Sequence, residues 1–130
     1  QLMKEFGENI GIAFQIRDDL LDYENTGLTG KAAGNDIKEK KITLPLIYAL
    51  EQAPASQKRH ILGILKKAKK SKSEISEVIS FVSDNGGMEY TKIKMNCYRD
   101  RALSILDSYP ESEVKASLID FVNYTTSRNK

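Results

Sequence analysis

Apolar side chains recur at helical spacing along the first two dozen positions. They follow one another at intervals of four or seven residues, at Leu2, Phe6, Ile10, Phe14 and Leu21. This pattern predicts one helix over residues 2–23. Between positions 10 and 16 apolar residues occupy almost every side of that helix. A helix of this kind is typically buried among neighbours.

The same reasoning predicts five further helices. Glycines at 27, 30 and 34 indicate a loop over residues 25–36. The expected helices run from a Thr43 cap to about residue 53, over 56–70, from 73 to the Asn85-Gly86-Gly87 break, over 88–106, and onward from Pro110 and Glu111. In the last one we expect the inward face to carry Val114, Leu118, Phe121 and Val122. No strand pattern is convincing, so the sequence predicts an all-α helical bundle, a single helical domain over residues 1–130.

Three aspartates lie together near the end of the first predicted helix. Asp18 and Asp22 are one turn apart, so their carboxylates share a helix face, and Asp19 lies beside them. Acids at this end face the negative pole of the helix dipole, so a positive group should compensate them. Oxygen ligands at this spacing suit Mg²⁺. A solvated helix end paired with Arg17 or nearby lysines explains the spacing equally well.

Lysines follow the aspartates on the glycine-rich loop. Lys31 precedes Asp36, and the adjacent Lys40 and Lys41 come just before the next helix. Metal ions bridge carboxylate and phosphate oxygens, while lysines neutralise the remaining phosphate oxygens. The charge pattern is therefore the one that binding of a diphosphate requires.

These segments resemble three ordered motifs of the trans-polyprenyl diphosphate synthases, such as the octaprenyl, geranylgeranyl and farnesyl diphosphate synthases. The matching runs are Phe14-Gln15-x-x-Asp18-Asp19-x-x-Asp22-Tyr23, Gly30-Lys31-x-x-Gly34-x-Asp36 and Lys41-x-Thr43-Leu44-Pro45. The resemblance extends over most of the chain and is strongest between residues 6 and 50. It implies the carboxy-terminal part of an isoprenoid-synthase-like fold, since the sequence has one Asp-Asp-x-x-Asp run and the family carries another on an earlier helix.

The resemblance also implies a role for each matching residue. Asp18 and Asp22 would be the magnesium-side carboxylates, with Asp19 as the middle acid of the motif. Lys31 would contact the allylic diphosphate, supported by Lys41. Many members carry glycine where this chain has Lys40, so either adjacent lysine could serve. The remaining positions are Phe14 and Gln15, beside the site where the two substrates meet, and Asp36, which would orient the lysine loop.

The implied enzyme is a prenyltransferase that condenses isopentenyl diphosphate with an allylic diphosphate by Mg²⁺-assisted ionisation. The resemblance further implies a homo-oligomer, a homodimer in the family. The 130-residue chain alone is expected to be inactive. Three alternatives stay open: a terpene-cyclase-like relative, a non-catalytic subunit, and a plain helical interaction module.

Composition bears on the class of protein, its partners and its compartment. Hydrophobic residues make up 40% and charged residues 29% of the chain, which is ordinary for a globular protein. A net charge of +2 gives no argument for nucleic acid as a partner. No apolar run approaches the ~18–20 residues of a membrane-spanning helix. The single cysteine, Cys97, cannot form an internal disulfide, which favours a reducing cytoplasm.

Overall fold

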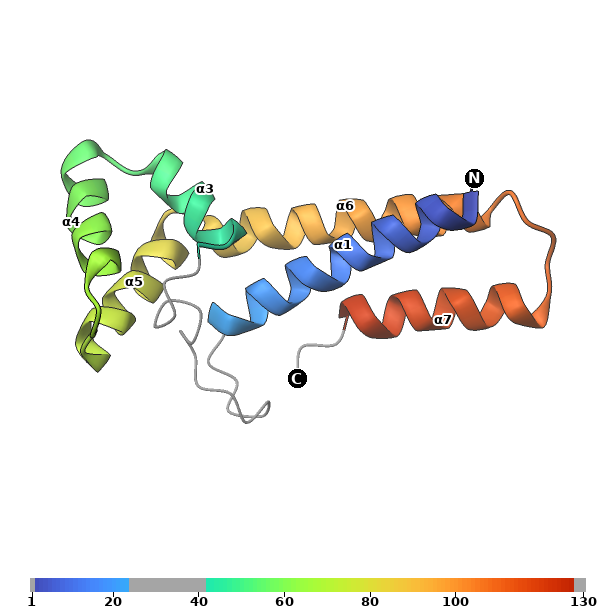
Figure 1. The fold of residues 1–130 in the computed structure, drawn as a ribbon. Helices are drawn as coiled ribbons and strands as arrows, with labels where there is room; N and C mark the ends of the chain where they lie inside the picture. Colours follow the sequence, from blue (N-terminus) through green and yellow to red (C-terminus); the bar gives the residue numbers. More distant parts are fainter. Residues whose placement is uncertain (1, 24–41, 128–130) are drawn as a thin grey trace. The chain divides into compact units, whose positions relative to one another are not determined.

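The computed structural model describes residues 2–23 and 42–127 (Figure 1). Every regular element in these ranges is a helix, which confirms the all-α prediction. The helices are α1 (Leu2–Tyr23), α3 (Leu44–Gln52), α4 (Ala55–Lys66), α5 (Lys72–Asp84), α6 (Gly87–Leu106) and α7 (Glu113–Ser127). The helix expected over residues 2–23 is confirmed as α1. The loop expected over residues 25–36 lies outside the described residues, as do Lys31, Asp36, Lys40 and Lys41.

The chain divides into two compact units, and the prediction of a single domain over residues 1–130 stays a prediction. The first unit holds α1 up to Asp18, α6 from Lys92, and α7. These three helices share a core of Phe6, Ala102, Leu106 and Val122. Ile10, Leu118 and Ile119 pack against that core. The first unit is therefore a three-helix assembly built around one shared core.

The second unit, residues 19–91, contains α3, α4 and α5. Its core gathers ten buried residues: Tyr23, Leu46, Ala49, Ile61, Ile64, Leu65, Ile75, Val78, Phe81 and Val82. Pro45 stands in the first turn of α3, where a missing N–H costs little. Thr43 occupies the expected cap position of α3, but its side chain makes no capping hydrogen bond.

A tight turn joins α5 to α6. Gly86 has φ of +78°, a conformation that side-chain-bearing residues adopt only with strain. A Cβ on Gly87 would lie 2.3 Å from the carbonyl oxygen of Pro45 and 2.7 Å from a methyl carbon of Val82. The start of α6 therefore packs directly on the backbone of α3. Tyr48 and Tyr90 stack beside this turn with ring centroids 4.1 Å apart.

The expected inward face of the last helix is half right. Val122 is buried in the core of the first unit and Leu118 packs against that core, whereas the expectation for Val114 and Phe121 is wrong. The helix begins at Glu113, and Val114 and Phe121 are 69% and 53% exposed. The buried face instead carries Lys115, Val122 and Thr126. The polar groups on this face can be buried because they have hydrogen-bond partners. Lys115 Nζ donates to Tyr109 O at 3.0 Å, and the Thr126 hydroxyl donates to Val122 O at 2.8 Å. Hydrogen bonding within the helix and its preceding turn thus offsets the cost of burying these groups.

Two further expectations need correction. The helix expected to reach residue 70 ends at Lys66, where Lys67 adopts an extended backbone conformation and the residues at 67–69 are exposed. The middle of α1 is not buried on all sides in this chain: Ala13 and Ile16 are buried, whereas Ile12 and Phe14 are 42% and 43% exposed. Only one face of α1 is covered here.

Candidate functional site

The three aspartates lie in the last two turns of α1. Asp18 is exposed, with 52% of its side chain accessible, whereas Asp22 is only 1% exposed. Their four-residue separation on a continuous helix places both carboxylates on one face, with Asp19 about 100° away. The last turn of α1 contains no basic residue. The positive charge that the dipole argument calls for must therefore come from elsewhere.

Arg17 supplies part of that charge. Its guanidinium lies 3.4 Å from Asp18 Oδ1, and it also donates to the carbonyl oxygen of Thr125 at 2.7 Å. It covers the ring of Phe14, 4.6 Å from the centroid. Only 13% of the side chain is exposed. Arg17 thus bridges α1 to the last turn of α7, where a cation meets the negative end of the helix dipole.

Sequence reasoning offered Arg17 only as a counter-ion for the aspartates. The ion pair between Arg17 and Asp18 is the contact that this alternative expects. The contact with Thr125 had no sequence signal, since the two residues are 108 positions apart. The structure therefore adds a residue that contacts both Asp18 and the last turn of α7.

Phe14 and Gln15 lie on the same helix as the aspartates. Phe14, Asp18 and Asp22 follow at four-residue intervals and so line one face of α1. Gln15 is exposed beside this face. Phe14, Gln15 and Asp18 are therefore accessible, whereas Asp22 is buried. That Lys31, Asp36 and Lys41 reach this face stays a prediction, because these residues lie outside the described ranges.

Within residues 2–23 and 42–127, no three His, Cys, Asp or Glu side chains form a group that could hold a metal ion. The described residues thus contain no complete metal cage. Two carboxylates on one helix face nevertheless fit Mg²⁺ chemistry, because that ion is usually held by one or two carboxylates and completes its shell with water and substrate phosphate. The donor set suits a metal shared with a diphosphate.

The sequence pattern of the family described as polyprenyl synthetase matches residues 1–82, which include the whole aspartate motif. The chain belongs to this family. The resemblance drawn from the three motifs is therefore confirmed at the level of the family.

Individual members of the polyprenyl synthetase family match nearly the whole chain. An octaprenyl diphosphate synthase of Haemophilus influenzae is 32% identical over 98% of this chain and 39% of its own length. A geranylgeranyl pyrophosphate synthase structure from Bacteroides thetaiotaomicron has a TM-score of 0.87 at 36% identity, over 98% of this chain and 42% of that one. A polyprenyl synthase structure from Caulobacter crescentus, in complex with calcium and isoprenyl diphosphate, has a TM-score of 0.89 at 26% identity, over 99% and 40% respectively.

The chain spans about two-fifths of the length of these relatives. Over that length it shares their all-α fold. The names of the relatives cover products of different chain length, octaprenyl in one and geranylgeranyl in another. Among the described helices, none combines the length and the apolar character needed to cross a bilayer.

Proposed function

We propose that the chain contributes the second aspartate-rich motif of a trans-polyprenyl diphosphate synthase, which condenses isopentenyl diphosphate with an allylic diphosphate in the cytoplasm. The observation that carries the proposal is the pairing of Asp18 and Asp22 on one face of α1 in a chain of the polyprenyl synthetase family. The Caulobacter crescentus relative, solved with a divalent cation and an isoprenyl diphosphate, supports the same chemistry.

Asp18 and Asp22 would hold Mg²⁺ on the diphosphate side, with Asp19 beside them. When bound, the ion would neutralise the charge that develops on the leaving diphosphate. Lys31 would bind diphosphate oxygens that the metal leaves free, with support from Lys41. Asp36 would orient the lysine loop, and Phe14 and Gln15 would line the space where the substrates meet. Electrostatic stabilisation of the leaving group would be the main catalytic contribution.

Arg17 would have a positioning role in this site. Its guanidinium is held by the Thr125 carbonyl and the Phe14 ring, so the Asp18 carboxylate is oriented before a ligand arrives. Its positive charge also offsets part of the repulsion among the three aspartates. The arrangement lowers the cost of gathering acids at the negative end of α1.

The 130-residue chain alone would not turn over, because its sequence contains one Asp-Asp-x-x-Asp run. We also propose that it self-associates, as a homo-oligomer. Ile12 on α1 and Phe121 and Tyr124 on α7 are 42–60% exposed, and burying such surface contributes about 25 cal/mol per Å². Sedimentation of the chain as a monodisperse monomer would contradict this part of the proposal.

Calorimetric titration with inorganic pyrophosphate tests the proposed site directly. Binding should require Mg²⁺, and Asp18→Asn and Asp22→Asn should each weaken it by about 10- to 100-fold, the effect of losing one contact to a charged group. The matched control is Asp84→Asn, which removes an exposed carboxylate at the end of α5. This control should bind like the wild type.

The same titration separates the alternatives. A plain helical interaction module would show no Mg²⁺-dependent binding of pyrophosphate. Binding that is independent of Mg²⁺, or equal in the Asp18→Asn and Asp84→Asn variants, would overturn the site assignment. A terpene-cyclase-like relative or a non-catalytic subunit would bind pyrophosphate as proposed, but the complete enzyme would not incorporate isopentenyl diphosphate into a longer chain.

A further inference from the structure

The connection between α4 and α5 concentrates positive charge. Five of the seven residues from 66 to 72, here called the lysine tip, are lysines. The nearest acid along the chain is Glu74, in the first turn of α5. Residues 66–74 therefore carry five lysines and one acidic residue. The proposed prenyltransferase chemistry makes no use of this segment.

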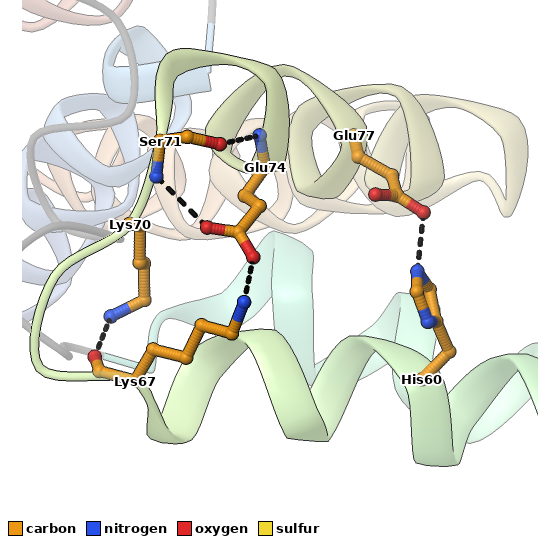
Figure 2. A network of polar contacts seen from close by, with 6 residues as sticks. All are labelled: His60, Lys67, Lys70, Ser71, Glu74 and Glu77. Carbon is orange, nitrogen blue, oxygen red and sulfur yellow. Dashed lines mark hydrogen bonds and ion pairs between the residues drawn. The ribbon is translucent and has the colours of Figure 1, made fainter.

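Two of the lysines hold the tip in shape. Lys67 Nζ contacts the Glu74 carboxylate, and Lys70 Nζ donates to Lys67 O at 2.8 Å (Figure 2). Ser71 and Glu74 form a reciprocal capping box, with the Glu74 N–H donating to Ser71 Oγ at 3.1 Å and the Ser71 N–H donating to Glu74 Oε1 at 2.9 Å. The turn is thus fixed by its own polar contacts, which use Lys67, Lys70 and Glu74.

The other three lysines are exposed. Lys66, Lys69 and Lys72 follow at three-residue intervals. Across residues 2–23 and 42–127, the structure shows no ion pair or hydrogen bond for their side chains. The next acid of α5, Glu77, pairs with His60 further along the helix pair (Figure 2). A fixed turn therefore presents three uncompensated charges to the surroundings.

We propose that the lysine tip docks the protein on the surface of an anionic lipid bilayer. Clusters of lysines next to one another are attracted to anionic leaflets, and each lysine near the surface raises binding about fivefold. Nucleic acid is the poorer occupant, because residues 61–80 contain no arginine and no aromatic residue for base-edge contacts or stacking. If the proposed function holds, docking would also bring the apolar product of chain elongation to the membrane that receives it.

Co-sedimentation with vesicles tests the docking without any substrate or Mg²⁺. The 130-residue chain should bind phosphatidylcholine vesicles enriched in phosphatidylglycerol far better than pure phosphatidylcholine vesicles, and added salt should weaken the binding. The triple variant Lys66→Gln, Lys69→Gln, Lys72→Gln should lose about 100-fold in affinity. It keeps Lys67 and Lys70, so circular dichroism should show unchanged helix content.

The matched control removes the same charge from exposed positions elsewhere: Lys4→Gln, Lys58→Gln, Lys92→Gln. Equal losses in the two triple variants would overturn the proposal in favour of net charge alone. Equal binding to neutral and anionic vesicles would overturn the proposal by assigning the vesicle binding to the exposed apolar faces. Absence of vesicle binding, with tip-dependent binding of RNA, would assign the tip to nucleic acid. Because the assay contains no diphosphate, each of these failures is independent of the prenyltransferase proposal.

Discussion

Arg17 should contribute more to stability than an ordinary surface arginine, because it joins two helices. Its guanidinium donates to the Thr125 carbonyl at 2.7 Å in the last turn of α7, and only 13% of its side chain is exposed. Arg17→Met keeps most of the aliphatic stem but removes the charge and the donors. The variant therefore isolates the polar bridge from the packing of the stem.

The size of the effect follows from the interactions that the substitution removes. A hydrogen bond from a charged donor contributes about 1.5–3 kcal/mol, and a cation at a helix carboxy terminus adds about 0.3–1 kcal/mol. Arg17→Met should therefore lower the free energy of unfolding by about 2–4 kcal/mol. Urea unfolding followed by circular dichroism measures this difference directly.

Arg99 is the matched control for this prediction. It also pairs with the next residue, Asp100, at 3.1 Å, but within the described ranges its side chain bonds no backbone carbonyl of another helix. Arg99→Met should cost no more than about 1 kcal/mol, the usual size of an exposed ion pair. Equal losses of stability for Arg17→Met and Arg99→Met would show that the bridge to α7 contributes nothing.

Two further predictions concern the second unit. Gly87→Ala should destabilise it by about 1–3 kcal/mol in urea unfolding, because the added methyl meets the Pro45 carbonyl. The control Gly63→Ala places its methyl in open space and should be neutral or slightly stabilising, and a Gly87→Ala variant as stable as the wild type would refute the close packing. Hydrogen bonds from Lys67 and the Ser71 backbone lower the pKa of Glu74 below its ordinary 4.5, so its ionised form favours folding. That contribution to the free energy of unfolding should be complete above pH 4.5 and lost as pH falls through the lowered pKa. The urea midpoint of Glu74→Gln should therefore fall less on acidification than the midpoint of the wild type, and parallel pH profiles of the two proteins would contradict this prediction.

Periodicity predicted the helices well where a local pattern decides the structure. α1 was expected over residues 2–23 and is observed there, and the break before α6 follows from the glycine that adopts positive φ. The buried face of α7 was predictable only in part: Val122 is buried as expected and Leu118 packs on the core, but Val114 and Phe121 stay exposed while Lys115 is buried. That choice depends on hydrogen bonds between Lys115 and the turn before the helix, which no hydrophobic pattern records.

The candidate site was predictable to a similar extent. Motif spacing placed Asp18 and Asp22 on one helix face and indicated the family, because both depend on residues close together in sequence. The bridge from Arg17 to Thr125 joins residues 108 positions apart, so only the fold shows it. The assigned roles of Lys31, Asp36 and Lys41 stay predictions, as these residues lie outside the described ranges.

A titration of the isotope-labelled chain with inorganic pyrophosphate, followed by amide chemical shifts with and without Mg²⁺, tests the central claim most directly. The titration separates two candidate binding places for pyrophosphate: the aspartate motif with a metal, and the lysine tip without one. We expect Mg²⁺-dependent shifts at Asp18, Asp22 and Lys31, and we expect these shifts to be lost in Asp18→Asn. Shifts confined to the lysine tip and indifferent to Mg²⁺ would contradict it.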